Sequence, residues 1–84
     1  MTAWLRCRLD IGMFSDEMAV TYPPVESKWQ RSVFVPKCCV HQEDARQGMV
    51  KVRVLVKDGT RFAVLPSQQR DLVKVHDGDL QQPQ

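Results

Sequence analysis

Thiol and imidazole side chains gather in one short stretch, PKCCVH, where Cys38 and Cys39 are adjacent and His41 follows closely. These side chains are zinc ligands, and a thiol beside an imidazole is also the arrangement of a cysteine nucleophile. A structural zinc site takes four ligands, usually as two spaced pairs, and the sequence has no second pair. We therefore interpret both cysteines as packing or turn residues. A thiol or metal site at Cys38, Cys39 and His41 remains an alternative.

A second polar stretch, HDGDL, places Asp77 and Asp79 on either side of Gly78. Two carboxylates could contact a hard cation, but a calcium loop supplies more oxygens over about twelve residues. Asp and Gly are also the residues that tight turns require, so we expect a turn here. We find no acid and base placed together for catalysis, and we predict a non-enzymatic protein with no cofactor and no metal.

Basic residues fall inside the segments that we expect to be strands, whereas most acidic residues fall in turns. With the valines facing inward, these cations would cover the outer face of a sheet, near aromatic side chains on which bases can stack. A net charge of only +2 is low for a non-specific DNA binder, and charged strand exteriors also prevent aggregation. Nucleic-acid binding is therefore an alternative hypothesis, and its candidate residues are Arg6, Arg8, Lys51, Arg53 and Arg61.

Large apolar side chains support the leading hypothesis. Trp4 and Trp29 are difficult to bury fully in so small a core, and Phe34 and Leu55 alternate with valines that we expect to face inward. A contiguous exposed apolar patch usually marks an interface. We therefore predict a binding module that acts through these four side chains, with a homodimer as the simplest assembly and another protein as a possible partner.

The elements that must position these side chains are short strands. In VKVRVLV, residues 50–56, the valines occupy one face and the other side chains the opposite face, and residues 5–11 alternate in the same way. Asp58-Gly59 predicts a two-residue hairpin into TRFAVLP. Further strands are expected in MAVTY, WQRSVFV and LVKV, and one helical turn in SQQRD.

Two segments repeat a pattern at a spacing of forty, VFVPKCCV at 33–40 and VKVHDGDL at 73–80. In both, Val-x-Val is followed by a turn-prone segment and an aliphatic residue, Val40 or Leu80, that we expect to pack back as a plug. The two halves are either a pseudo-symmetric pair of three-stranded units or an accidental echo. Both interpretations predict an all-β fold: a small barrel or rolled antiparallel sheet of five to six strands with at most one short helical turn.

The 84 residues are enough for one domain, which we place at residues 1–80 with a frayed tail at 81–84. No apolar stretch approaches the length of a membrane helix, so we expect no membrane contact. Arg6 and Arg8 interrupt the position where a signal peptide has its apolar core. Three cysteines that are best read as reduced thiols favour the cytoplasm.

The segments GMFSDEMAV and VFVPKCCV resemble those of short, uncharacterised bacterial β-proteins, some of which are carried on mobile gene cassettes. The strand spacing also resembles that of SH3-like barrels. The resemblance implies a small barrel in a bacterial protein. It transfers no catalytic or binding residue, because the matching motifs are turn signals.

Overall fold

The computed structural model describes residues 2–24, 28 and 30–81, and these are nearly all β. The strands are β1 Thr2–Ile11, β2 Glu17–Tyr22, β3 Arg31–Pro36, β4 Val40–Gln42, β5 Gln47–Lys57, β6 Thr60–Val64, β7 Leu72–Lys74 and β8 Leu80–Gln81. Two 3₁₀ turns, η1 Lys37–Cys39 and η2 Asp77–Asp79, precede β4 and β8. The predicted all-β fold with a rolled antiparallel sheet is confirmed.

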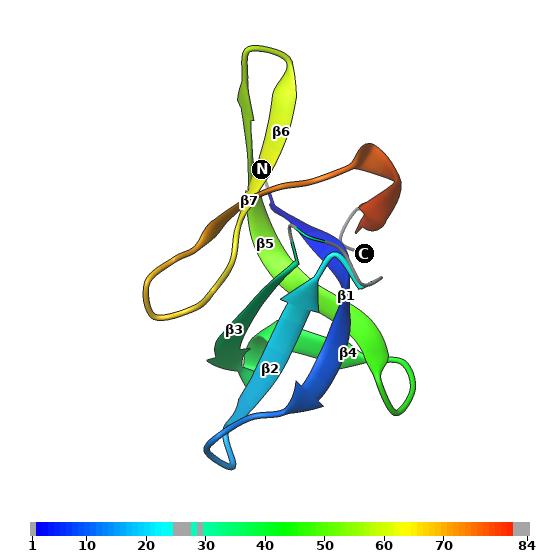
Figure 1. Cartoon of the computed structure of the whole chain (residues 1–84), viewed down its shortest axis with the longest axis vertical. Coiled ribbons are helices and arrows are strands. Elements are labelled where there is room, and N and C mark those ends of the chain that lie inside the picture. The colour runs from blue at the N-terminus through cyan, green and yellow to red at the C-terminus, as the bar shows by residue number, and fades with distance from the viewer. Residues whose placement is uncertain (1, 25–27, 29, 82–84) are drawn as a thin grey trace.

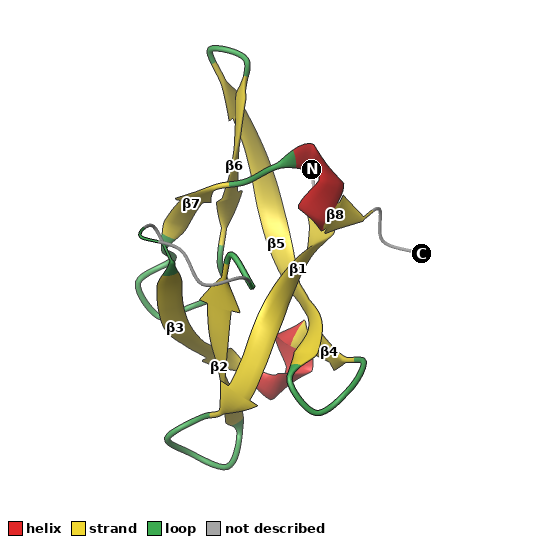
Figure 2. Ribbon diagram, turned by 45° about the vertical axis from the view of Figure 1, so that its right-hand side comes forward, coloured by secondary structure: helices red, strands yellow, loops and turns green. Residues whose placement is uncertain are grey.

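The sheet has the order β3-β2-β1-β5-β6-β7, and every neighbouring pair is antiparallel. It curls into a half-barrel whose two long central strands, β1 and β5, run through the middle of the molecule (Figures 1 and 2). The short strands β4 and β8 lie off this path, β4 beside β5 and β8 beside β1. We did not predict β4 and β8 as strands.

The two halves of the chain are related by a pseudo-two-fold axis that passes between Leu5 and Val50. These residues pair at the centre of β1 and β5, and β1 to β4 correspond in order to β5 to β8. Each half gives its last strand to the other half, because Val40 pairs with Val50 and Leu80 pairs with Leu5. Val40 and Leu80 pack against the core as predicted, so the repeated pattern reflects a pseudo-symmetric architecture.

The core lies on the concave side of the sheet and follows from the alternation of apolar residues. Side chains at every second position of β1 and β5 point into it, and Leu5, Leu9 and Val50 are fully buried. Two residues that precede a proline, Tyr22 and Leu65, occupy corresponding places at its flanks. The other buried hydrophobic residues are Ala3, Cys7, Val20, Val35, Val52, Val54, Ala63, Val73 and Val75.

The connections between strands use distinct turn chemistry. Asp58 and Gly59 both have positive φ, 53° and 76°, as the predicted two-residue hairpin between β5 and β6 requires. The helical turn expected at 67–71 is instead a β-turn, closed by the Arg70 N–H donating to the Ser67 carbonyl at 2.9 Å.

Gln81 pairs with Trp4, so the sheet extends one residue into the segment that we expected to fray, and residues 82–84 lie outside the described part. Within the described ranges, no helix is both long and apolar enough to cross a membrane.

Candidate functional site

The outer face of β1 and β5 collects four of the five predicted basic candidates. Arg6 and Arg8 project outward from β1, and Lys51 and Arg53 project outward from β5, opposite to the buried residues of the same strands. Successive outward positions on a strand are about 7 Å apart. Because Arg6 pairs with Met49 and Lys51 with Trp4, the four cations occupy four successive rows of the two-stranded ribbon. We call these four residues together with Trp4 the basic ribbon.

Trp4 lies in the middle of the basic ribbon. It pairs with Lys51 on one side and with Gln81 on the other, and its side chain is only partly buried. Its indole ring meets the His41 imidazole edge-on, with ring centroids 6.3 Å apart and an interplanar angle of 64°. A partly exposed aromatic side chain therefore lies directly beside a lysine.

The charge on this surface is largely uncompensated. Asp10 and Glu17 are the only acidic residues in the described strands, and Asp10 forms an ion pair with Arg8, with Nε and Oδ2 3.3 Å apart. Among the described residues, Arg6, Lys51 and Arg53 make no ion pair. The small net charge of the chain therefore conceals a local concentration of positive charge, with most carboxylates placed in turns.

Arg61, the fifth basic candidate, does not join the basic ribbon. Within β6 it pairs with Val56, on the opposite face of the sheet from its neighbour Phe62. Its Nε lies 3.4 Å from Oδ1 of Asp77. Lys57, which we did not consider, continues the outward series of β5, and the alternation within residues 47–57 was enough to identify it.

The apolar candidates do not form one patch. Phe34 is 46% exposed on the edge strand β3, Leu55 is 47% exposed on β5, and β1 and β2 lie between these strands. Trp4 belongs to the basic ribbon, and Trp29 lies outside the described residues. The interface predicted from these side chains is therefore not one contiguous surface in the described structure.

A different apolar surface exists on the outer side of β5, β6 and β7. Leu55 pairs with Phe62, and in the next row Val64 pairs with Leu72, which is 48% exposed. We call these four side chains the apolar face. Sequence reasoning missed it because only the strand register shows which residues of three strands are neighbours. In the other half, the corresponding positions are occupied by Asp10, Ala19, Thr21 and Ser32.

The cysteine and histidine candidates do not assemble into a site. Cys38 and Cys39 belong to η1 with their Sγ atoms 3.9 Å apart, while the His41 ring faces Trp4. Burial, and then the Cys38 thiol, raise the pKa of Cys39 against an opposing effect of Lys51, so this thiol is not activated as a nucleophile. Across the described residues, no three His, Cys, Asp or Glu side chains converge in a way that could hold a metal ion.

Cys7, the third cysteine, is a buried core residue. Its thiol points at the Gly48 carbonyl with an S···O distance of 3.7 Å, and burial raises its pKa to about 12. It therefore has a packing role.

No protein-family model, curated protein or solved structure matches this chain.

Proposed function

We propose that this protein is a non-enzymatic module that binds single-stranded nucleic acid on the basic ribbon. The observation that carries the proposal is the row-by-row placement of Arg6, Arg8, Lys51 and Arg53 along two paired strands, with the partly exposed Trp4 among them. Proteins that bind single strands combine cations that follow the backbone with aromatic rings on which bases stack. The basic ribbon supplies both on one continuous surface.

The roles of the residues follow from their positions. Arg6, Lys51 and Arg53 have no acidic partner among the described residues and are therefore the principal phosphate contacts, whereas Arg8 is partly engaged by Asp10. Trp4 is the stacking platform, held from one edge by His41. This function replaces self-association as the first choice because Phe34 and Leu55 lie on separate parts of the sheet.

The test is a fluorescence titration with a short oligothymidine at several salt concentrations. A Trp29→Phe background leaves Trp4 as the only tryptophan, so quenching reports contact at the basic ribbon. With three or four phosphates contacted, the logarithm of the affinity should fall with the logarithm of salt concentration with a slope of about −2 to −3. A flat salt dependence, or binding that leaves Trp4 fluorescence unchanged, would contradict the proposal.

A matched pair of charge reversals assigns the surface. Lys51→Glu removes a ribbon cation and should weaken binding at least about tenfold, whereas Arg46→Glu makes the same change of net charge in the exposed connection between β4 and β5. If both variants lose affinity equally, the attraction comes from net charge, and the basic ribbon is not the binding surface.

Self-association is the second candidate function, and the apolar face favours it. Exposed and half-buried apolar side chains lie there at positions that the corresponding half fills with Asp10, Ala19, Thr21 and Ser32, so the fold itself does not require them. The predicted homodimer would form with this face packed against its copy in a second chain.

Light scattering over a dilution series measures this directly. Leu55→Glu places a charge inside the apolar face and should shift a dimer to the monomer, whereas Phe34→Glu, on the distant strand β3, should leave it intact. A monomeric wild-type chain at all concentrations, or a dimer that survives Leu55→Glu, would exclude this surface.

A further inference from the structure

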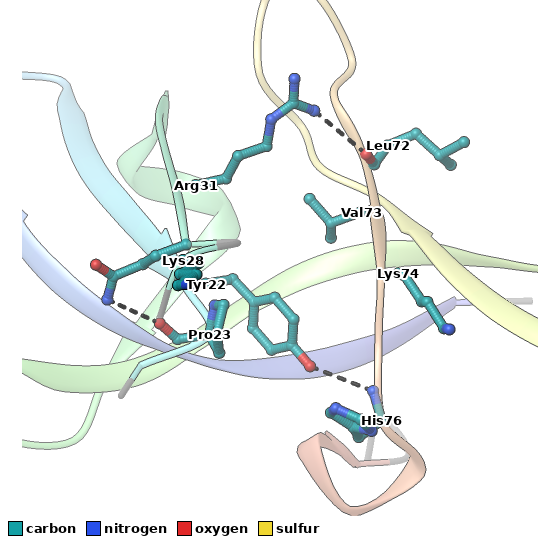
Figure 3. A pocket seen from close by; sticks show the side chains of 9 residues that line it. Tyr22, Pro23, Lys28, Arg31, Leu72, Val73, Lys74 and His76 are labelled. Carbon is teal, nitrogen blue, oxygen red and sulfur yellow. Dashed lines mark hydrogen bonds between the residues drawn. The ribbon is translucent and has the colours of Figure 1, made fainter. Parts of the chain in front are cut away.

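The half-barrel stays open along a seam between its two edge strands, β3 and β7, and a pocket of about 770 Å³ lies in this seam (Figure 3). This volume falls within the range of small-molecule sites. The pocket is remote in the sheet order from the basic ribbon on β1 and β5, so the two surfaces are separate. The proposed function leaves it unused.

The floor of the pocket is apolar and fixed in place. Tyr22 and Val73 are 3% and 7% exposed, and the Tyr22 ring is held at its far end by two hydrogen bonds. Its hydroxyl donates to Asp79 Oδ2 at 2.7 Å and accepts the His76 backbone N–H at 3.2 Å. A rigid aromatic floor of this kind can hold the body of a ligand without first having to be ordered.

The charged side chains at the rim of the pocket are basic among the described residues. Lys28, Arg31 and Lys74 line it together with His76, and none of its described lining residues is a carboxylate. In Figure 3, Arg31 reaches across the seam toward the Leu72 carbonyl, where the N···O distance is 3.4 Å, the outer limit of a hydrogen bond. No described acidic side chain forms an ion pair with these cations, so an anion in the pocket would relieve their mutual repulsion.

The pseudo-two-fold axis provides an internal control for this charge. The corresponding groove in the seam has Phe34 and Pro36 where the pocket has Lys74 and His76, and it is lined by Glu17 and Asp71 as well as by Arg31, which the two share. The corresponding strand positions are filled without cations there, so the fold does not demand Lys74 and His76. The described lining of the pocket has no carboxylate to offset its cations, whereas the counterpart has two.

We propose that the seam pocket binds a small organic anion, with a phosphate or carboxylate held by Arg31 and Lys28 and an aromatic or apolar body resting on Tyr22 and Val73. A guanidinium holds either oxyanion through paired N–H donors. The uncharged body of such a ligand covers the apolar floor, which inorganic phosphate alone would not do.

Isothermal titration calorimetry with four probes tests the proposal: adenosine 5′-monophosphate, adenosine, benzoate and inorganic phosphate. Binding of the nucleotide alone identifies a phosphate monoester, binding of benzoate alone identifies a carboxylate, and binding of both identifies an oxyanion site of either kind. Three outcomes would overturn the proposal. Adenosine could bind as tightly as its monophosphate, or inorganic phosphate could bind as tightly as both organic anions. The third outcome is that no probe binds at millimolar concentration.

Variants place the ligand and separate this site from the basic ribbon. Arg31→Gln should weaken the bound probe at least about tenfold, whereas Lys57→Gln, an equal change of charge at the end of β5, should not. Amide chemical shifts of Val73 and His76 should move on titration in the folded wild-type protein. Lys51→Glu should weaken oligonucleotide binding at least about tenfold and leave binding of the probe unaffected. Weaker binding of both ligands together, or probe shifts confined to β1 and β5, would contradict a separate pocket.

Discussion

The two seam grooves occupy corresponding positions in the two halves but present different chemistry. Both include Arg31, but one also carries Lys74 and His76, whereas its counterpart carries Phe34, Pro36 and the acidic side chains of Glu17 and Asp71. The inward-facing residues beside them are of the same type across the axis, with Val33 corresponding to Val73 and Val35 to Val75 (both pairs lie in the repeated segments). Packing therefore fixes only the inward positions, and the exposed positions are free to acquire separate functions.

The outer face of the sheet shows the same division. Near the axis, Arg6 corresponds to Lys51 and Arg8 to Arg53, so the basic ribbon is nearly symmetric. Farther out, the apolar face on β5 to β7 corresponds to mostly polar residues on β1 to β3. The symmetric part is the better candidate for a function that both halves perform together.

The largest expected effect distinguishes Gly48 from Ala3, which occupies the corresponding position in the other half. A Cβ at Gly48 would collide with the His41 carbonyl and a Leu9 methyl group, whereas Ala3 accommodates its own Cβ in the other half. Gly48→Ala should lower the free energy of unfolding by about 2–3 kcal/mol because β4 must move away from β5. Ala3→Gly should cost only about 0.5–1 kcal/mol. Urea denaturation of both variants measures the difference, and equal losses would contradict the close approach of β4.

A smaller effect separates Tyr22 from its counterpart Leu65. Tyr22→Phe leaves Asp79 and the His76 N–H without this partner and should lower the free energy of unfolding by about 1–2 kcal/mol at neutral pH. Leu65 makes no such bond, since its side chain has no polar atom.

The same tyrosine predicts a dependence on pH. Burial and the hydrogen bond to Asp79 raise the pKa of Tyr22 to about 12 from its ordinary value of 10.0. The folded state holds this proton more tightly, so the resulting stability is complete below pH 10 and is lost as the pH rises from 10 toward 12. From pH 8 to pH 11, the denaturation midpoint should therefore fall more for the wild type than for Tyr22→Phe. The loss of stability due to Cys7 should be the same in both proteins. Parallel losses would show that Tyr22 is not responsible.

The smallest effect concerns the two 3₁₀ turns. Gly78 in η2 corresponds to Cys38 in η1, and a Cβ at Gly78 would meet nothing within 4 Å. Its φ lies outside the left-handed region, so Gly78→Ala should raise the free energy of unfolding by about 0.5 kcal/mol through the unfolded state. A thermal melt detects this as a small upward shift. A decrease in the melting temperature would mean that η2 needs the conformational freedom of glycine, which η1 does not need.

Several parts of the fold were predictable because their causes are local. Alternation over ten or more residues identifies β1 and β5, since a strand turns successive side chains to opposite faces. Asp58-Gly59 identifies the hairpin, since both residues tolerate positive φ. The strands β4 and β8 have only three and two residues, too few for any pattern, and they exist because β5 and β1 offer free edges there. The segment that begins at Ser67 forms a turn and not a helix, because the Ser67 hydroxyl donates a hydrogen bond to the Asp71 carboxylate.

The candidate site was predictable to the same extent. The basic residues of β1 and β5 share a face because alternation within one strand fixes their direction. Arg61 was assigned to the wrong face because the two-residue hairpin places Phe62 opposite Leu55, which turns Arg61 to the other side. Trp4 was expected in an apolar interface, and its position among cations depends on the pairing of two distant strands.

The sequence by itself determined the fold class, the long strands and the hairpin, because periodicity and turn chemistry act over a few neighbouring residues. Tertiary structure alone decided the exchange of β4 and β8 between the halves, the apolar face and the seam pocket. Each of these joins residues from three or more segments, and their adjacency depends on strand register and on the curl of the sheet.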